Sequence, residues 1–374
     1  MMSESIKNTE EGSYFVISDT HLGSNTKGGN VPDVNALCQF LEWINELKLD
    51  DKILVQKNNS NGENCYEKSI VPPSKIILLG DILDLWDTEN GDRSNVIKEA
   101  AKPFALLQSI KCDKIYVVGN HDQDLYELAD ILKEERRKGK KESHLNLGSC
   151  VLEVHKRHYP EKVDCGKDIG GKKYAFIHGQ QYDRVQITEW ISKKFKIRFD
   201  PLDFIQDISN VSWIKSIFRK KIPTVVYIGS VFLIVYLYSL GWIGRTMLTV
   251  LLTFAAIPPL VKTITRIQNL VWKLVKPKDK TVEQVIENGS YYKKGSDHMN
   301  ADVVVFGHTH MPGSYYLKEK NRLFINTGAW LKANDNRKVN TFAYIDNKGI
   351  DVLSWVGEKK KDTYVFEEVC SHRT

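Results

Sequence analysis

Five short apolar runs in this chain each end in residues that can bind a metal ion. The runs have the length and the aliphatic content of buried β-strands, and they cover Tyr14 to Ser18, Lys75 to Leu79, Lys114 to Val118, Tyr174 to Ile177, and Asp302 to Phe306. In an α/β sheet, the groups just beyond the carboxyl ends of adjacent strands meet in one crevice. The pattern therefore predicts an α/β fold in which residues far apart in the sequence share a single site.

The residues that follow these runs offer oxygen and imidazole nitrogen, with no thiolate. They occur in the segments Asp19-Thr20-His21, Gly80-Asp81 with Asp84, Gly119-Asn120-His121-Asp122, His178-Gly179, and Gly307-His308-Thr309-His310. Such a donor set suits manganese, iron, zinc or cobalt better than calcium, magnesium or a cysteine-based structural zinc. Any one of these residues alone could be an ordinary strand-end or helix-capping residue, but recurrence in five segments favours a metal site.

The number of candidate ligands indicates two ions rather than one. Two aspartates, four histidines and one asparagine exceed what a single four-coordinate ion can use. A carboxylate that bridges two ions about 3.5–4 Å apart would account for the surplus, and this arrangement is typical of phosphoester hydrolysis.

In this order the segments resemble the calcineurin-like metallophosphoesterase superfamily. The motif elements Asp-x-His, Gly-Asp-x-x-Asp, Gly-Asn-His-Asp, His and Gly-His-x-His are all present. The Leu-Trp after Asp84, Pro312, and the stretch Asn326 to Trp330 resemble the branch that contains UDP-2,3-diacylglucosamine pyrophosphohydrolase. One departure is His121, where the lipid A pyrophosphohydrolases carry arginine. The resemblance covers roughly residues 14–210 and 280–355 and implies a four-layer αββα sandwich.

The resemblance also implies a role for each motif residue. One ion is implied on Asp19, His21, Asp81 and His310, and a second on Asp81, Asn120, His178 and His308. His121 is then the catalytic histidine that assists the leaving oxygen, and Asp84 is its orienting partner. An alternative role for Asp84 is N-cap of a helix at Leu85 and Trp86. Asp122 is interpreted as the cap of a helix that begins near Leu125.

The remaining pattern predicts two amphipathic helices and further strands. Apolar residues recur with helical spacing over Val34 to Leu47 and over Val96 to Ile110. Asn58 to Asn64 is a polar stretch typical of a surface loop. Five runs after His310 are expected to form the second sheet of the sandwich, namely Ser314 to Leu317, Leu323 to Asn326, Thr341 to Ile345, Val352 to Trp355, and Thr363 to Glu367.

Two uncharged stretches separate the fourth motif from the fifth. Ile222 to Trp242 contains no charged residue, and after Gly244-Arg245 a second such stretch covers Thr246 to Val261. The first is about long enough to span a hydrocarbon core, and the second is slightly short. Lysines and arginines crowd both outer flanks, which by the positive-inside rule predicts a membrane-associated protein with its metal domain on the cytoplasmic side.

Three interpretations of residues 222–261 are open. A spanning or re-entrant helical hairpin is favoured over a helix pair lying in one leaflet, and over a helical cap packed within the protein or a dimer. The expected domains are a metallophosphoesterase domain in two parts, 1–185 and 281–374, and a helical membrane-associated cap at 186–280 with the hairpin at 222–261. The basic flanks would add attraction to anionic membrane lipids.

The favoured function is that of a membrane-associated dinuclear-metal phosphohydrolase. Its expected cofactors are two divalent ions, manganese first and iron, zinc or cobalt as alternatives, and its expected substrate carries a phosphoester or pyrophosphate bond in a lipid-linked molecule. The alternatives are a phosphodiesterase or phosphatase for a soluble nucleotide, and a non-catalytic scaffold on the same fold. Six dispersed cysteines with no Cys-x-x-Cys pair, and no signal peptide ahead of the first strand, favour a reducing compartment. Nucleic acid is not expected as a partner, because 53 basic and 47 acidic residues mostly cancel.

Overall fold

The computed structural model describes residues 12–24, 31–59, 62–85, 94–126, 143–147, 150–156, 158–160, 166–180, 236, 239–241, 281–288, 299–332, 338–360 and 362–373. The chain divides into two compact units, Met1–Asp183 with Asp279–Thr374, and Arg184–Lys278. All the strands and helices named below belong to the first unit.

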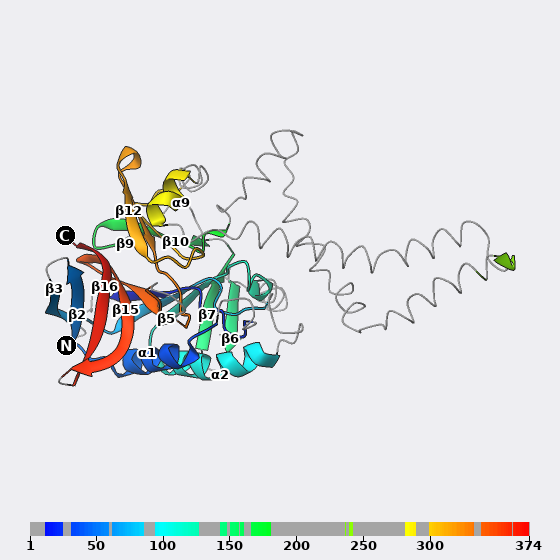
Figure 1. Ribbon diagram of the computed structural model, residues 1–374, viewed down its shortest axis with the longest axis horizontal. Coiled ribbons are helices and arrows are strands. Elements are labelled where there is room, and N and C mark those ends of the chain that lie inside the picture. The colour runs from blue at the N-terminus through cyan, green and yellow to red at the C-terminus, as the bar shows by residue number, and fades with distance from the viewer. Residues whose placement is uncertain are drawn as a thin grey trace, which may run out of the picture. The chain divides into compact units, whose positions relative to one another are not determined.

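Ten strands of the described residues form one mixed sheet (Figure 1). Their order across the sheet is β3 (Gly62–Ser69), β2 (Lys52–Asn59), β16 (Thr363–Arg373), β15 (Gly349–Lys360), β14 (Thr341–Asp346), β1 (Ser13–Ile17), β4 (Pro73–Leu79), β5 (Asp113–Val117), β7 (Cys150–His155) and β6 (Ser143–Leu147). The strands β1, β4, β5 and β7 are parallel neighbours. The first three motifs therefore emerge side by side at one edge of this sheet.

The second sheet carries the last two motifs. It is made of β12 (Gly313–Leu317), β13 (Arg322–Asn326), β11 (Val303–Phe306), β10 (Lys172–Ile177) and β8 (His158–Tyr159), with β9 (Lys167–Ile169) paired to β10. The strands β10, β11 and β13 are parallel. The motif strands β10 and β11 are thus neighbours, as β1, β4 and β5 are in the first sheet.

Alternating side chains build four layers from these elements. In β1, Phe15 and Ile17 belong to the apolar cluster with α1 (Val34–Glu46) and α2 (Ser94–Ser109), whereas Tyr14 and Val16 pack against the second sheet. The outer face of the second sheet packs on α9 (Val282–Asn288) through a third cluster. Figure 1 shows α1 and α2 along one face of the large sheet, and α9 beside β12. The described residues therefore form an αββα sandwich.

An aromatic cluster fastens α1 to the face of the large sheet on which it lies. The side chain of Asp33 caps this helix by accepting from the amide of Ala36 (3.2 Å). On its buried face the Phe40 ring lies 4.8 Å from the Trp330 ring and 4.5 Å from the Phe342 ring, measured between centroids. Trp330 follows β13, so the helix anchors a segment that leads away from the second sheet.

The predicted helices and motif strands are confirmed, but the predicted second sheet is wrong in part. The runs at Ser314 to Leu317 and Leu323 to Asn326 do join the second sheet, as β12 and β13. The runs that became β14, β15 and β16 lie instead in the first sheet, where β14 pairs antiparallel with β1. The reason is visible in β14, whose Phe342 and Tyr344 pack on the α1 side while Ala343 and Ile345 face the second sheet.

Two further predictions concern segments outside the regular motif strands. The prediction of a surface loop at 58–64 is wrong in part, because β2 extends to Asn59 and β3 begins at Gly62, and the register pairs these two residues. In the described part of the chain, no helix is both long and apolar enough to cross a membrane. The predicted hairpin at 222–261 lies outside the described residues, except for 236 and 239–241.

Candidate metal centre

The predicted ligands lie at strand ends where the backbone turns into the left-handed region. Five of the seven have a positive φ, namely Asp19 (51°), His21 (46°), Asp81 (51°), His308 (69°) and His310 (56°). This conformation costs a non-glycine residue about 1 kcal/mol or more, so it persists only where the surrounding structure imposes it. Several residues with a strained backbone in one place point to a functional site.

Backbone hydrogen bonds between neighbouring loops impose these turns. The amide of Asp19 donates to the carbonyl of Gly80 (3.0 Å), which fastens the loop after β1 to the loop after β4. In the second sheet the amide of Gly307 donates to the carbonyl of His178 (3.0 Å), which fastens the loop after β11 to the loop after β10. The motifs are therefore joined in pairs by the main chain.

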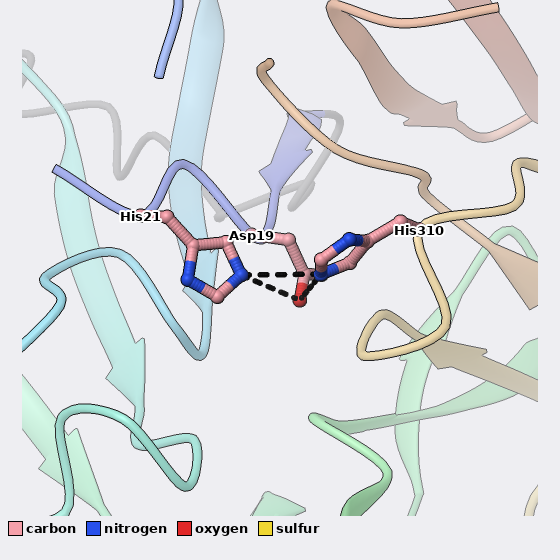
Figure 2. A group of neighbouring side chains, drawn as sticks. All are labelled: Asp19, His21 and His310. Atoms are coloured by element: carbon pink, nitrogen blue, oxygen red, sulfur yellow. Dashed lines mark hydrogen bonds and ion pairs between the residues drawn. The ribbon is translucent and has the colours of Figure 1, made fainter. Parts of the chain in front are cut away.

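The first group of ligands is Asp19, His21 and His310, whose ligand atoms all lie within 4.8 Å of one another. Asp19 and His21 follow β1, and His310 follows β11, so the group contains residues from both sheets. The Nε2 atoms of the two histidines are 3.1 Å apart, and Asp19 Oδ1 is 3.3 Å from His310 Nε2. Figure 2 shows the three side chains converging on one point.

The second group is Asp81, His178 and His308, with ligand atoms again within 4.8 Å of one another. Asp81 Oδ2 is 3.1 Å from His178 Nε2. The same oxygen is 4.0 Å from Nε2 of His21, which belongs to the first group. One carboxylate oxygen of Asp81 therefore faces both groups.

Hydrogen bonds to the other ring nitrogen leave Nε2 of two histidines available to a metal. His178 Nδ1 is 2.9 Å from the carbonyl oxygen of Leu79. Because a carbonyl only accepts, Nδ1 keeps its proton, and Nε2 is the nitrogen that would bind an ion in place of its own proton. His21 Nδ1 lies 3.4 Å from Asp84 Oδ2, and the same argument applies to that ring.

Asp84 divides its two carboxylate oxygens between two histidines. Oδ2 faces His21, and Oδ1 is 3.0 Å from Nδ1 of His121. Asp84 is buried, whereas 18% of the His121 side chain is exposed, so His121 is the member of this pair that a substrate can reach. The structure thus places Asp84 beside His121 as the predicted pairing requires. Trp86, which the alternative N-cap role requires, lies outside the described residues.

Backbone amides from other motifs hold the second oxygen of each ligand carboxylate. The amide of His121 donates to Asp81 Oδ1 (2.8 Å), and the amide of His308 donates to Asp19 Oδ2 (2.9 Å). Hydrogen bonds from amides to a carboxylate are charge-assisted and fix its orientation. The remaining oxygen of each carboxylate is directed to the histidines.

Two motif glycines make this close approach possible. A Cβ at Gly119 would overlap Asp81 Oδ1, and a Cβ at Gly307 would overlap Asp19 Oδ2. These positions therefore need glycine because of the space that the ligand carboxylates occupy.

Buried carboxylates give the centre a strongly negative field. Burial alone would raise the pKa of Asp81, but the nearby His178 and His121 outweigh it and hold that pKa well below its usual range. The reciprocal effect falls on His178, where burial lowers the pKa but Asp81 and Asp19 raise it to about 10. A field that retains protons on histidine so strongly also attracts divalent cations.

Buried polar atoms without a hydrogen bond also indicate a site for divalent cations. Asp19 Oδ1, Asn120 Oδ1 and His178 Nε2 are among the buried polar atoms of the described residues that make no hydrogen bond. Asp19 Oδ1 and His178 Nε2 lie only at ion-pair distance from His310 and Asp81. Polar atoms at such depth normally have a partner, and two divalent ions would supply one, the first to Asp19 and the second to Asn120 and His178. The nitrogen and oxygen donors suit manganese, iron, zinc or cobalt.

The structure brings the predicted site residues together where the loops after β1, β4 and β5 of the large sheet meet the loops after β10 and β11 of the small sheet. Asp19, His21 and His310 form one group, and Asp81, His178 and His308 form the other, while His121 and Asp84 lie against His21. Asn120 directly precedes His121 at the end of β5. Their individual catalytic roles stay predictions.

Asp122 is a site residue whose importance the sequence did not reveal, and its interpretation as a helix cap is wrong for the side chain. Its carbonyl oxygen accepts from the amide of Leu125 (3.0 Å), but its carboxylate accepts from the amides of Ile82 (2.8 Å) and Gly119 (2.6 Å). Burial, and next the negative charge of Asp81, raise the pKa of Asp122 to about 6. The available signal was its place directly after His121.

Asn326 is a second residue of this kind. Its Nδ2 donates to the carbonyl of Gly307 (2.9 Å) and to Thr309 Oγ1 (2.9 Å), and its Oδ1 accepts from the amide of Gly328 (2.7 Å). The side chain therefore holds the loop that carries His308 and His310. The sequence signal for Asn326 was that a polar residue ends a buried run. It also begins the stretch Asn326 to Trp330, which resembles the pyrophosphohydrolase branch.

Comparison with known proteins adds a family match. Residues 13–312 match the model of the family described as calcineurin-like phosphoesterase. No curated protein matches the sequence.

Several solved structures are similar over most of the chain but at low identity. One is a novel archaeal phosphodiesterase (13% identity, 91% of this chain and 99% of that chain, TM-score 0.32). Others are vacuolar protein sorting 29 from Cryptosporidium parvum (10%, 96% and 96%, 0.35) and a cold-active protein-tyrosine phosphatase of a psychrophilic Shewanella species (12%, 96% and 80%, 0.32). At these TM-scores the likeness carries no argument, and the assignment depends on the family match.

Gly119→Ala is expected to weaken Mn²⁺ binding by about tenfold or more, because the added methyl group displaces the Asp81 carboxylate. Calorimetric titration with Mn²⁺ measures this change. Gly171→Ala is the control, since a Cβ there meets nothing within 4 Å among the described residues and its φ of 77° strains only the backbone. Unchanged Mn²⁺ affinity in Gly119→Ala would contradict the close-approach argument.

Proposed function

Since the chain belongs to the calcineurin-like phosphoesterase family, we propose that this metal-dependent phosphoesterase uses two divalent ions, preferably Mn²⁺, to hydrolyse a phosphoester or pyrophosphate bond in a lipid-linked substrate. The two-ion part of the proposal rests on one observation. Asp81 Oδ2 lies between His178 of one ligand group and His21 of the other, as a carboxylate shared by two ions must.

The proposed ligands divide between the two ions as the two groups do. Asp19, His21, Asp81 and His310 would hold one ion, and Asp81, Asn120, His178 and His308 would hold the other. Such ions, when bound, activate a water for attack and neutralise the phosphoryl oxygens. The protein supplies a rigid frame for them, because backbone amides fix both ligand carboxylates.

His121 is proposed as the general acid. Burial would lower the pKa of its ring, but the charge of Asp81 and the hydrogen bond to Asp84 outweigh it and raise that pKa to about 9. A raised pKa favours the protonated ring, which can donate a proton to the leaving oxygen. Asp84 holds Nδ1 of the ring and thereby fixes its orientation.

The lipid-linked substrate is supported by the sequence. The uncharged stretch at 222–242 has about the length that spans a bilayer, and the stretch at 246–261 is slightly shorter; basic residues on their outer flanks add a pattern typical of membrane association. The residues around Asp84, Pro312 and Asn326 to Trp330 resemble enzymes that act on a nucleotide-sugar lipid. We therefore propose that the metal domain works at the cytoplasmic surface of a membrane, where such substrates are presented.

Replacing the shared ligand and replacing the general acid should have different consequences. Asp81→Ala should lose bound metal and activity together, because both ligand groups use that carboxylate. His121→Ala should keep its metal and lose about two to four orders of magnitude in kcat. Metal analysis of the purified variants, together with kcat on bis-p-nitrophenyl phosphate, checks both. Loss of an ion in His121→Ala would rule out the acid role.

The pairing of His121 with Asp84 should appear in the pH profile. Asp84→Asn removes a negative charge and a hydrogen bond that raise the pKa of His121, so that pKa falls. The protonated acid is then lost at lower pH, and the alkaline limb of kcat/KM should move to lower pH. Asp113→Asn is the control, because this exposed carboxylate pairs with Lys75 at the start of β5. An alkaline limb at the wild-type pH would disprove the pairing.

The substrate and the membrane can be tested with one deletion. Full-length protein should remain in the membrane fraction after high-salt and carbonate washes. Replacing Ile222 to Val261 by a short Gly/Ser bridge should release a soluble enzyme that still hydrolyses bis-p-nitrophenyl phosphate, because all seven proposed ligands lie outside the deletion. That enzyme should lose most of its activity on a nucleotide-sugar lipid in vesicles. Equal activity of both proteins on the lipid would show that residues 222–261 do not deliver the substrate. Full-length protein that hydrolyses a soluble nucleotide but not the lipid would favour the soluble nucleotide substrate.

A further inference from the structure

The carboxylate of Asp122 joins two loops that carry metal ligands. It is fully buried, and its Oδ2 accepts from the amide of Ile82 (2.8 Å) and from the phenol of Tyr116 (2.6 Å). Its Oδ1 accepts from the amide of Gly119 (2.6 Å). Ile82 directly follows the ligand Asp81, and Gly119 directly precedes the ligand Asn120.

Only a carboxylate meets the requirements of this position. Donors approach both oxygens, so both must accept. An asparagine would place an amide N–H against either the Gly119 amide or the Ile82 amide, and two donors would then face each other in a buried site. The second bond between the same loops, from the His121 amide to Asp81 Oδ1, can form only if Gly119 stays close to Asp81.

We propose that Asp122 is a positioning residue that sets the distance between the loop of Asp81 and the loop of Asn120 and His121, and thereby the affinity for the second ion. The proposal rests on the proposed two-ion function. The first ion depends on it less, because three of its four ligands, Asp19, His21 and His310, come from the loops after β1 and β11. The second ion needs Asp81 and Asn120 together. These two ligands are adjacent in sequence to Ile82 and Gly119, whose amides donate to the Asp122 carboxylate.

The test is a titration of the full-length, metal-free protein with Mn²⁺, in which electron paramagnetic resonance measures the free ion. Wild type should bind two ions. Asp122→Asn should bind the first as wild type does and the second about 10- to 100-fold more weakly. Tyr116→Phe is the matched control and should weaken the second step less, because the Ile82 and Gly119 amides keep their acceptor.

Each other result overturns the inference. An unchanged second step in Asp122→Asn would show that the carboxylate does not position the loops. Equal weakening of both steps, together with a lower Tm of the metal-free protein, would show a role in general stability alone. A wild type that binds a single ion would instead overturn the proposed two-ion function, and this inference with it.

Hydrogen exchange on the wild type decides the matter if Asp122→Asn does not fold. In the metal-free protein, the amides of Ile82 and Gly119 should be protected as strongly as those inside β4, because Asp122 holds them without any ion. Exchange of these two amides at the rate of an unfolded peptide, with β4 still protected, would overturn the proposal.

Discussion

The amides of His121 and His308 hold the carboxylates of Asp81 and Asp19, and the rest of the site depends on these two hydrogen bonds. Each bond joins motifs from different strands. The first connects neighbouring loops of the large sheet, and the second connects the large sheet to the small one. With one oxygen of each carboxylate fixed in this way, the other can face only the histidines. The bonds therefore convert separate strand ends into a single cluster of ligands.

The strain at the strand ends is the energetic consequence of this arrangement. Five ligands in the left-handed region cost several kcal/mol together, at about 1 kcal/mol or more each. A relaxed backbone would point these side chains elsewhere and leave the loops free to move. The main-chain bonds between loops, such as that from Asp19 to Gly80, hold the strained form.

The sequence predicted the local parts of this structure well because they depend on local patterns. The motif strands appear as apolar runs, and the ligands stand at the points where those runs end. The membership of the two sheets was harder to predict, since a buried strand such as β14 is apolar on both faces and gives no sign of which sheet it joins. Antiparallel pairing of β14 with β1 is a long-range choice that depends on the packing of Phe342 against Phe40.

The supporting residues of the site were less predictable than the ligands. Asp122 and Asn326 act through the backbone of other loops, and such contacts leave no spacing pattern in a sequence. A polar residue at a helix start is usually a cap, so the sequence favoured that role for Asp122. Its true partners, Ile82 and Gly119, become neighbours only because β4 and β5 pair in parallel.

The spacing of Asp81 and Asp84 shows how one loop would serve both the proposed metal binding and the proposed proton transfer. Asp81 directs an oxygen to both ligand groups, whereas Asp84 lies behind them and accepts from the ring of His21 on one oxygen and from the ring of His121 on the other. An amide could not accept on both sides, so the position requires a carboxylate. Burial raises the pKa of Asp84, but the two histidine contacts outweigh it and hold the pKa well below its usual range, so the charge persists. In the proposed mechanism, this single buried charge keeps His21 in the tautomer that a metal ligand needs and favours the protonated form of His121, which accounts for the position of both histidines against the same side chain.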